Sequence, residues 1–110
     1  MRVMVLSLTL VFVACSPSSN VGRDVGARCD SSDECDDRCL SPEDFPGGFC
    51  SLSCDTDGDC PGGTACVDVE GGVCLFTCSD ATGCEFLGQG YECETEEFGD
   101  GSDGTVEVCR

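Results

Sequence analysis

The sequence predicts a small disulfide-rich fold: a tandem array of three four-cysteine units with short β-hairpins and little helix after a signal peptide. Thirteen of the 110 residues are cysteine, a density typical of disulfide scaffolds. Large apolar residues are scarce after the first 14 residues, so cross-links must stand in for a conventional core. The cysteines also recur with a repeating spacing, which predicts the array.

Residues 1–14 have the features of a lipoprotein signal peptide. The apolar run from Val3 to Val13 is shorter than the roughly 20 residues that a membrane-spanning helix needs. The ending Val-Phe-Val-Ala-Cys15 resembles the lipobox of bacterial lipoproteins, although Phe12 stands where Leu is usual. That resemblance implies cleavage before Cys15 and a diacylglyceryl group on its sulfur.

The cysteine count sets Cys15 apart independently. Thirteen is odd, and without Cys15 twelve remain, or three sets of four. Several acyl chains on Cys15 would anchor the protein to a membrane, the outer one by preference because Ser16 follows. The alternative is a plain secretory signal that removes Cys15. Residues 15–28 are rich in Pro, Gly, Ser and Asn, so we expect a lipidated cysteine and a flexible tether.

Three cysteine-rich units follow, at 29–50, 51–74 and 75–110. Five residues separate the first two cysteines of every unit, and three residues separate the last cysteine of one unit from the next. Gly-x-Cys closes the first two units, which agrees with the spacing. Such a repeat indicates an array of similar modules. We expect strands at 64–69, 72–77 and 105–109, with hairpin turns at 69–73 and 100–104.

Spacing leaves three disulfide pairings open in each unit. We favour first-to-third with second-to-fourth, because crossed bridges brace both loops and because partly similar small secreted modules use this pattern. The expected bridges are Cys29–Cys39, Cys35–Cys50, Cys54–Cys66, Cys60–Cys74, Cys78–Cys93 and Cys84–Cys109.

The second unit carries a further resemblance. Its pattern Cys-x5-Cys-Pro-Gly-Gly-x2-Cys with a later Gly-x-Cys is similar to the Dickkopf N-terminal cysteine-rich module and its colipase-like relatives. The chain also resembles cysteine-rich lipoproteins of myxobacteria. The adjacent Cys-Cys pair of colipase-like folds is absent here. Because the animal modules bind receptors at cell surfaces, the resemblance implies, by analogy, a binding role.

The charge is strongly acidic: 22 Asp and Glu stand against five Arg, with no Lys or His. Such a surface repels nucleic acid, so we expect no nucleic-acid partner. The expected partners are the membrane, through the lipid anchor, and an extracellular or periplasmic protein or glycan.

One run of acids is a candidate metal site. Asp55, Asp57 and Asp59 alternate around a glycine, as carboxylates do in calcium-binding loops. A weak calcium site is the hypothesis, and a solvated acidic turn is the alternative. Zinc held by thiolates is disfavoured, since the chain lacks His and Cys-x2-Cys. We expect no other cofactor.

Catalysis has little support in this sequence. There is no His or Lys to act as a base, and no Ser has an evident activating partner. We therefore expect no catalytic residue and no enzyme.

Eight of the bulky side chains outside the signal peptide are candidates for packing or for binding. They either fill the gaps between units or line one face as anchors for a partner. They are Phe45, Phe49, Leu52, Leu75, Phe76, Phe86, Leu87 and Tyr91.

The function expected from the sequence is that of a non-enzymatic, surface-anchored cysteine-rich lipoprotein that binds partners or acts as a scaffold at the bacterial envelope. One alternative is a calcium-dependent extracellular binding module. The other is a secreted inhibitor or toxin-like effector, which requires that Cys15 is not retained.

Overall fold

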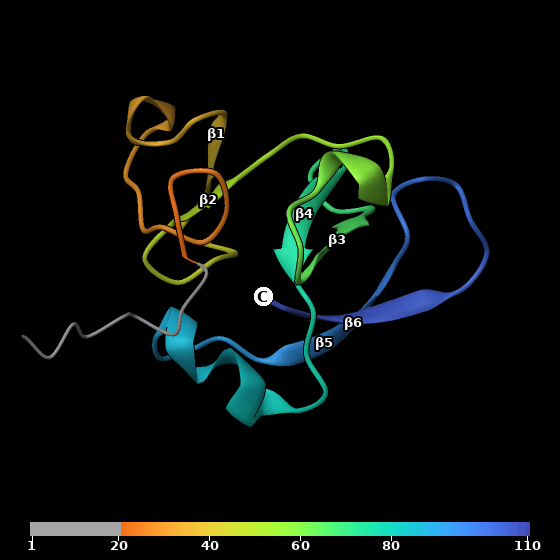
Figure 1. Cartoon of the computed structure of the whole chain (residues 1–110). Helices are drawn as coiled ribbons and strands as arrows, with labels where there is room; N and C mark the ends of the chain where they lie inside the picture. Colours follow the sequence, from red (N-terminus) through yellow and green to blue (C-terminus); the bar gives the residue numbers. More distant parts are fainter. Residues whose placement is uncertain (1–20) are drawn as a thin grey trace, which may run out of the picture.

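Three antiparallel two-stranded hairpins form the framework of residues 21–110, the part of the chain that this computed structural model describes (Figure 1). A short 3₁₀ segment precedes each hairpin, so every four-cysteine unit has the same order of elements. The elements are η1 (Ser32–Glu34), β1 (Arg38–Leu40), β2 (Phe49–Ser51), η2 (Asp57–Asp59), β3 (Thr64–Val67), β4 (Val73–Phe76), η3 (Ala81–Leu87), β5 (Cys93–Glu97) and β6 (Thr105–Cys109).

The small disulfide-rich fold expected from the sequence is confirmed. Strands β3, β4 and β6 lie within the segments expected to be extended. The turn between β3 and β4 contains three successive residues with positive φ, namely Glu70, Gly71 and Gly72. Strands β1, β2 and β5 were not located from the sequence, and the structure adds them. Within residues 21–110, no helix has the length and apolar character that crossing a membrane requires.

Six disulfides cross-link the three units. Cys66 and Cys74 lie opposite each other across the β3–β4 hairpin but do not bond to each other. Their disulfide partners, Cys54 and Cys60, both lie in the loop that precedes the hairpin. The bridges therefore fasten the loop to both strands, and each contributes on the order of 2–4 kcal/mol. First-to-third and second-to-fourth pairing holds in all three units, as favoured above: Cys29–Cys39, Cys35–Cys50, Cys54–Cys66, Cys60–Cys74, Cys78–Cys93 and Cys84–Cys109.

The segment before the first cysteine of each unit pairs with the last strand of that unit. In the second unit the Cys74 N–H donates to the carbonyl of Leu52 at 3.1 Å. In the first unit the Cys50 N–H donates to the carbonyl of Ala27 at 2.8 Å, in the equivalent position. The segment that follows β4 also pairs with β6, where the Cys78 N–H donates to the carbonyl of Glu107 at 3.0 Å. The repeating unit thus includes the residues that the sequence analysis treated as joints.

The expectation of a flexible tether over residues 15–28 is therefore wrong for residues 21–28. Val25 is buried at 1% exposure in the core, and the Gly26 N–H donates to the carbonyl of Cys50 at 2.8 Å. These contacts join residues far apart in the sequence. A segment rich in small and polar residues gives little sign that it will form them. Residues 15–20 lie outside the described part of the chain.

One shared core holds the three units together. Phe49 is at its centre, with its ring centroid 5.7 Å from that of Phe45, 6.4 Å from Phe76 and 6.1 Å from Tyr91. The Tyr91 hydroxyl donates to the carbonyl of Pro46 at 3.0 Å, which ties the third unit to the first. The tandem units are packed as one body, because each alone has too little apolar surface to bury.

The bulky side chains fill the gaps between units, with one exception. Six of the eight are buried and Leu52 packs against the core from its edge, whereas the side chain of Phe86 is 44% exposed.

Candidate functional site

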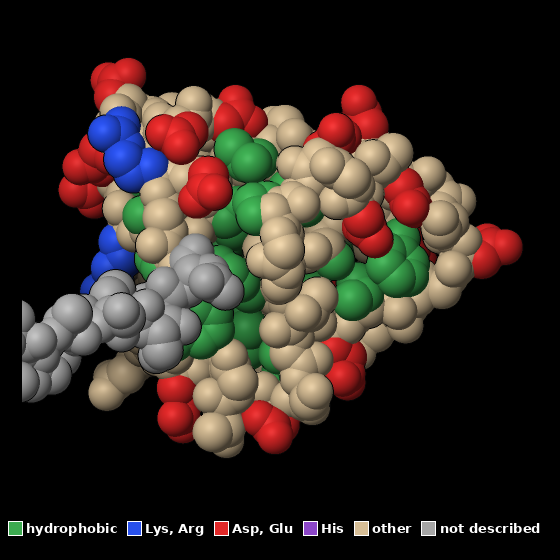
Figure 2. Space-filling model, viewed as in Figure 1, with side chains coloured by type: hydrophobic (Ala, Val, Ile, Leu, Met, Phe, Trp, Pro, Cys, Tyr) green, Lys and Arg blue, Asp and Glu red, His purple; other side chains and the backbone are tan. Residues whose placement is uncertain are grey.

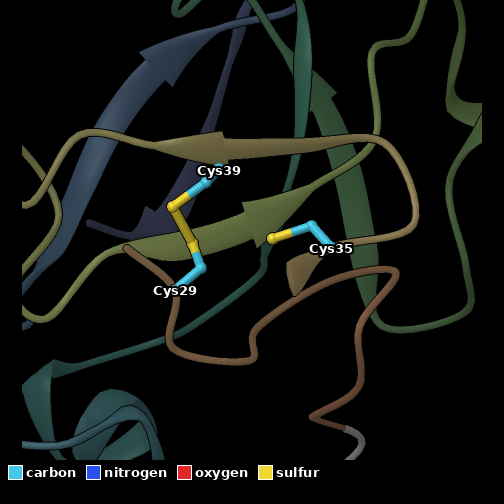
Figure 3. A group of neighbouring side chains, drawn as sticks. All are labelled: Cys29, Cys35 and Cys39. Carbon is cyan, nitrogen blue, oxygen red and sulfur yellow. A yellow bond between two sulfur atoms is a disulfide. The ribbon is translucent and has the colours of Figure 1, made fainter. Parts of the chain in front are cut away.

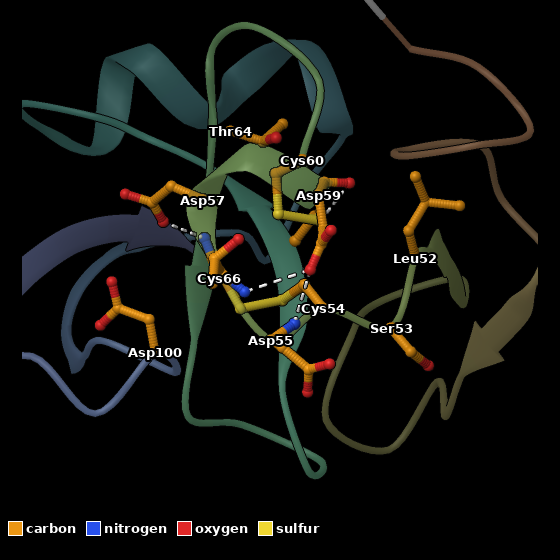
Figure 4. The surroundings of a disulfide bond; sticks show 12 residues. Leu52, Ser53, Cys54, Asp55, Asp57, Asp59, Cys60, Thr64, Cys66 and Asp100 are labelled. Carbon is orange, nitrogen blue, oxygen red and sulfur yellow. Dashed lines mark hydrogen bonds between the residues drawn. A yellow bond between two sulfur atoms is a disulfide. The ribbon is translucent and has the colours of Figure 1, made fainter.

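The acidic loop between Cys54 and Cys60 was the sharpest candidate site in the sequence. Figure 4 shows its three aspartates around the Cys54–Cys66 disulfide. Asp59 turns back on the loop, and its Oδ2 accepts from the backbone N–H groups of Asp55 at 2.9 Å and Thr56 at 3.2 Å. These two bonds hold the pKa of Asp59 below its usual value.

Asp57 has a different structural role in the same loop. Its Oδ1 accepts from the Cys66 N–H at 2.8 Å, which joins η2 to β3 (Figure 4). Two of the three candidate calcium ligands are thus hydrogen-bonded to backbone donors. Asp57 and Asp59 therefore stabilise the conformation of the loop.

The first gaps of the other units use acids in the same way. Glu34 accepts from the backbone N–H groups of Asp30 and Ser31, which lowers its pKa. In the third unit Asp80 accepts from the Gly83 N–H at 3.1 Å. This capping role was not predicted from the sequence. The signal for it was the acid that ends the five-residue gap in units one and two.

No group of three carboxylates within residues 21–110 brings its oxygen atoms within 4.8 Å of one another. Asp55, Asp57 and Asp59 do not converge, so a calcium ion would have to compete with their backbone partners. Calcium binding at this loop stays a hypothesis. The triples of potential ligands that do converge are cysteines, such as Cys29, Cys35 and Cys39 in Figure 3. All of these are disulfide-bonded, which leaves no thiolate among them to bind a metal.

A surface hollow of about 510 Å³ lies where the first and second units meet. Asp37 holds one wall in place, because its Oδ2 accepts from the Ser53 N–H at 2.7 Å. Carboxylates in such a hollow suit basic groups or cations, but no side chain lining it has the chemistry of a base–nucleophile pair. The lining residues are Asp37, Leu52, Ser53, Cys54, Asp55, Asp59 and Gly71.

A second hollow, of about 300 Å³, lies beside the loop that joins β5 to β6. Asp68, Glu97 and Asp103 contribute its charge, and Phe98 contributes an apolar edge. Beside this hollow, two backbone hydrogen bonds join the second hairpin to the third. The Asp68 N–H donates to the carbonyl of Glu97 at 2.9 Å, and the Gly99 N–H donates to the carbonyl of Cys66 at 3.0 Å. Like the first hollow, it is polar and acidic.

The proposed lipidation site, Cys15, lies outside the described residues. All twelve cysteines of residues 21–110 are bonded to one another in six pairs, so none of them is left to pair with Cys15.

No protein-family model, curated protein or solved structure matches this chain. The class of protein is therefore described from its structure alone. It is a small, acidic, mostly β protein in which three disulfide-stapled hairpin units share one core.

Proposed function

We propose that this chain is a non-enzymatic lipoprotein, anchored through Cys15, that binds partners or acts as a scaffold at the bacterial envelope. The observation that carries the proposal is the complete pairing of the other twelve cysteines. A thirteenth cysteine at the end of a lipobox-like sequence then has a chemical reason to be there. Six disulfides also suit an oxidising compartment outside the cytoplasm.

The surface supports a binding role better than a catalytic one. Most of its acids are exposed (Figure 2). Several of them cap backbone N–H groups. The two acidic hollows offer carboxylates to basic groups of a protein or glycan partner. Stapled, solvent-facing loops on a rigid body are suited to recognition.

The anchoring half of the proposal is tested with Cys15→Ser in a host that processes lipoproteins. We expect the wild-type protein in the membrane fraction, and the variant in the soluble fraction or retained unprocessed. Ser18→Ala, in the same segment, is the matched control and should fractionate like wild type. Wild-type protein that leaves the membrane without detergent would contradict the anchor.

The binding half is tested by cross-linking in whole cells with a reagent that couples carboxylates to amines. We expect a discrete product that joins the anchored protein to an envelope component. Paired neutral substitutions in the first hollow, Asp37→Asn with Asp55→Asn, should reduce it, whereas Glu43→Gln outside the hollow should not. A product pattern that none of these variants alters would argue against the hollows as binding surfaces.

A further inference from the structure

Two large apolar side chains are exposed on the described part of the chain, and both lie near where that part begins. Val21 is 36% exposed and Phe86 is 44% exposed. The other large apolar side chains of residues 21–110 are buried or partly buried. Exposed apolar side chains indicate an interaction surface only where they adjoin, so the relative position of these two matters.

Val21 and Phe86 lie near the same buried side chain, Phe76, which is 5% exposed. The Phe86 ring packs edge-on against Phe76, with centroids 5.1 Å apart. A Cβ on Gly26 would stand 2.8 Å from the Phe76 ring and 3.4 Å from the Val21 Cα, so Gly26 joins the two sides without covering either. We call the exposed side chains of Val21 and Phe86, with the buried Gly26 and Phe76 beneath them, the N-terminal face.

Only five residues, 16–20, separate Cys15 from this face. Even fully extended, the chain from Cys15 to Val21 spans no more than roughly 20 Å. A lipid on Cys15 would thus keep the N-terminal face next to the bilayer. At such a short range the local concentration of lipid is high, so even a weak contact would form.

The positive charge of the body lies on the same side. Three of its four arginines, Arg23, Arg28 and Arg38, fall within the first 18 described residues. On the face that Figure 2 shows, the blue side chains lie at the left, the side on which the coloured trace begins in Figure 1. No carboxylate of the described residues forms an ion pair with Arg28, which leaves its guanidinium free to meet lipid phosphates.

We propose that the N-terminal face is a membrane-docking surface, with Phe86 at the headgroup–acyl boundary of the bilayer that carries the anchor. This proposal rests on the lipid anchoring of Cys15 proposed above. The loop between β5 and β6, on the opposite side of the molecule in Figure 1, then points away from the membrane together with its acidic hollow. The anchored body thus has a fixed orientation, with an acidic side presented to partners.

The test uses the absence of Trp from this chain. Full-length lipidated protein is purified from membranes as Phe86→Trp, and as Ser102→Trp in the β5–β6 loop as the matched control. Each is reconstituted in phosphatidylcholine vesicles with and without brominated acyl chains. We expect F86W emission to shift to shorter wavelength and to be quenched by the bromine, and S102W emission to do neither.

The mass of Cys15 in the same samples separates the two proposals. If Cys15 carries acyl chains but F86W is as solvent-exposed in vesicles as in the released, delipidated body, docking is wrong and the anchor stands. Equal quenching of F86W and S102W would mean no fixed orientation, which also overturns docking. A blue shift of F86W in detergent micelles, together with a dimer in sedimentation, would assign the face to a second copy instead. If Cys15 carries no acyl chain, anchor and docking fall together.

Discussion

The glycine two residues before the last cysteine of units one and two has a steric cause. Gly48 and Gly72 have φ of +75° and +105°. A Cβ on Gly48 would lie 1.9 Å from the carbonyl oxygen of Cys29, and one on Gly72 would lie 2.6 Å from that of Cys54. The strand that closes each unit therefore packs directly onto the backbone of the first cysteine. The Gly-x-Cys signature is visible in the sequence, but its reason is a contact across more than fifteen residues.

Gly72→Ala should destabilise the protein. The new methyl group combines a clash with backbone and a strained positive φ, so we expect the free energy of unfolding to fall by about 1–3 kcal/mol. The measurement is denaturant unfolding with the disulfides intact. Gly62→Ala is the control, since nothing lies within 4 Å of its Cβ position. Equal stability of the two variants would refute this account of the signature.

The capping acids make stability depend on pH. Backbone N–H donors lower the pKa of Asp59 from 3.8 and that of Glu34 from 4.5. Their contribution is therefore present above those values and is lost as the pH falls through the lower pKa of the folded state.

Asp59→Asn should be less stable than wild type at neutral pH, because an amide is a weaker acceptor for the two backbone donors. The difference should shrink as the pH falls below 3.8 and through the lowered pKa of folded Asp59, where the wild-type side chain also becomes neutral. Thermal unfolding across acidic and neutral pH measures it. Asp55→Asn is the control in the same loop, because among the described residues its carboxylate caps no backbone group. A difference that is constant with pH would exclude the capping role.

At the scale of elements, the segment between units acts as an extra strand. Ser51, at the end of β2, is fully buried, and its hydroxyl donates to the carbonyl of Cys74 on β4 at 2.7 Å. Ser53, two residues later, is exposed. The extra strand is seen in the backbone pairing, because the Cys74 N–H donates to the carbonyl of Leu52 and Ser53 forms an antiparallel bridge with Val73.

Ser51→Ala should therefore lower the free energy of unfolding by about 1 kcal/mol, since it removes one buried hydrogen bond. Ser53→Ala should change stability little. Hydrogen exchange of the Cys74 amide, which donates to the same segment, should speed up in the first variant alone. Comparable effects of both substitutions would mean that the segment is only a linker.

The elements also show which parts of the structure the sequence could predict. The β3–β4 hairpin is readable because β-branched residues flank a Glu-Gly-Gly turn, and β6 carries alternating valines. Strand β5 reads Cys-Glu-Thr-Glu-Glu, where only pairing with β6 overrides the low strand propensity. The capping by Asp59 is local, within four residues, and could have been predicted from the acid at the end of the gap. The pairing of residues 21–28 depends on three-dimensional proximity, so the sequence did not show it.

At the scale of the whole molecule, the shared core decides whether the units are one body. The repeat predicted the units, while their packing around Phe49 follows from the shortage of apolar residues in each. Tyr91 is 7% exposed in this core, whereas Phe86 is largely outside it. Burial raises the pKa of Tyr91 to about 12, because the charged phenolate is disfavoured there.

Tyr91→Ala should cost about 3–5 kcal/mol of stability, as other large-to-small changes of buried aromatic residues do. Phe86→Ala should cost about 1 kcal/mol or less, since the side chain is already half in solvent. Both are measured by thermal unfolding of the disulfide-bonded protein. Similar losses in both would place Phe86 in the core and remove the basis of the docking face.

The most direct test of the account is the intact mass of the native protein from membranes, with and without a thiol label. The account predicts a chain that begins at Cys15, carries acyl chains and takes up no label, because the twelve other cysteines are paired. A chain that begins after Cys15 would contradict the lipid anchor. Label on several cysteines would contradict the disulfide framework itself.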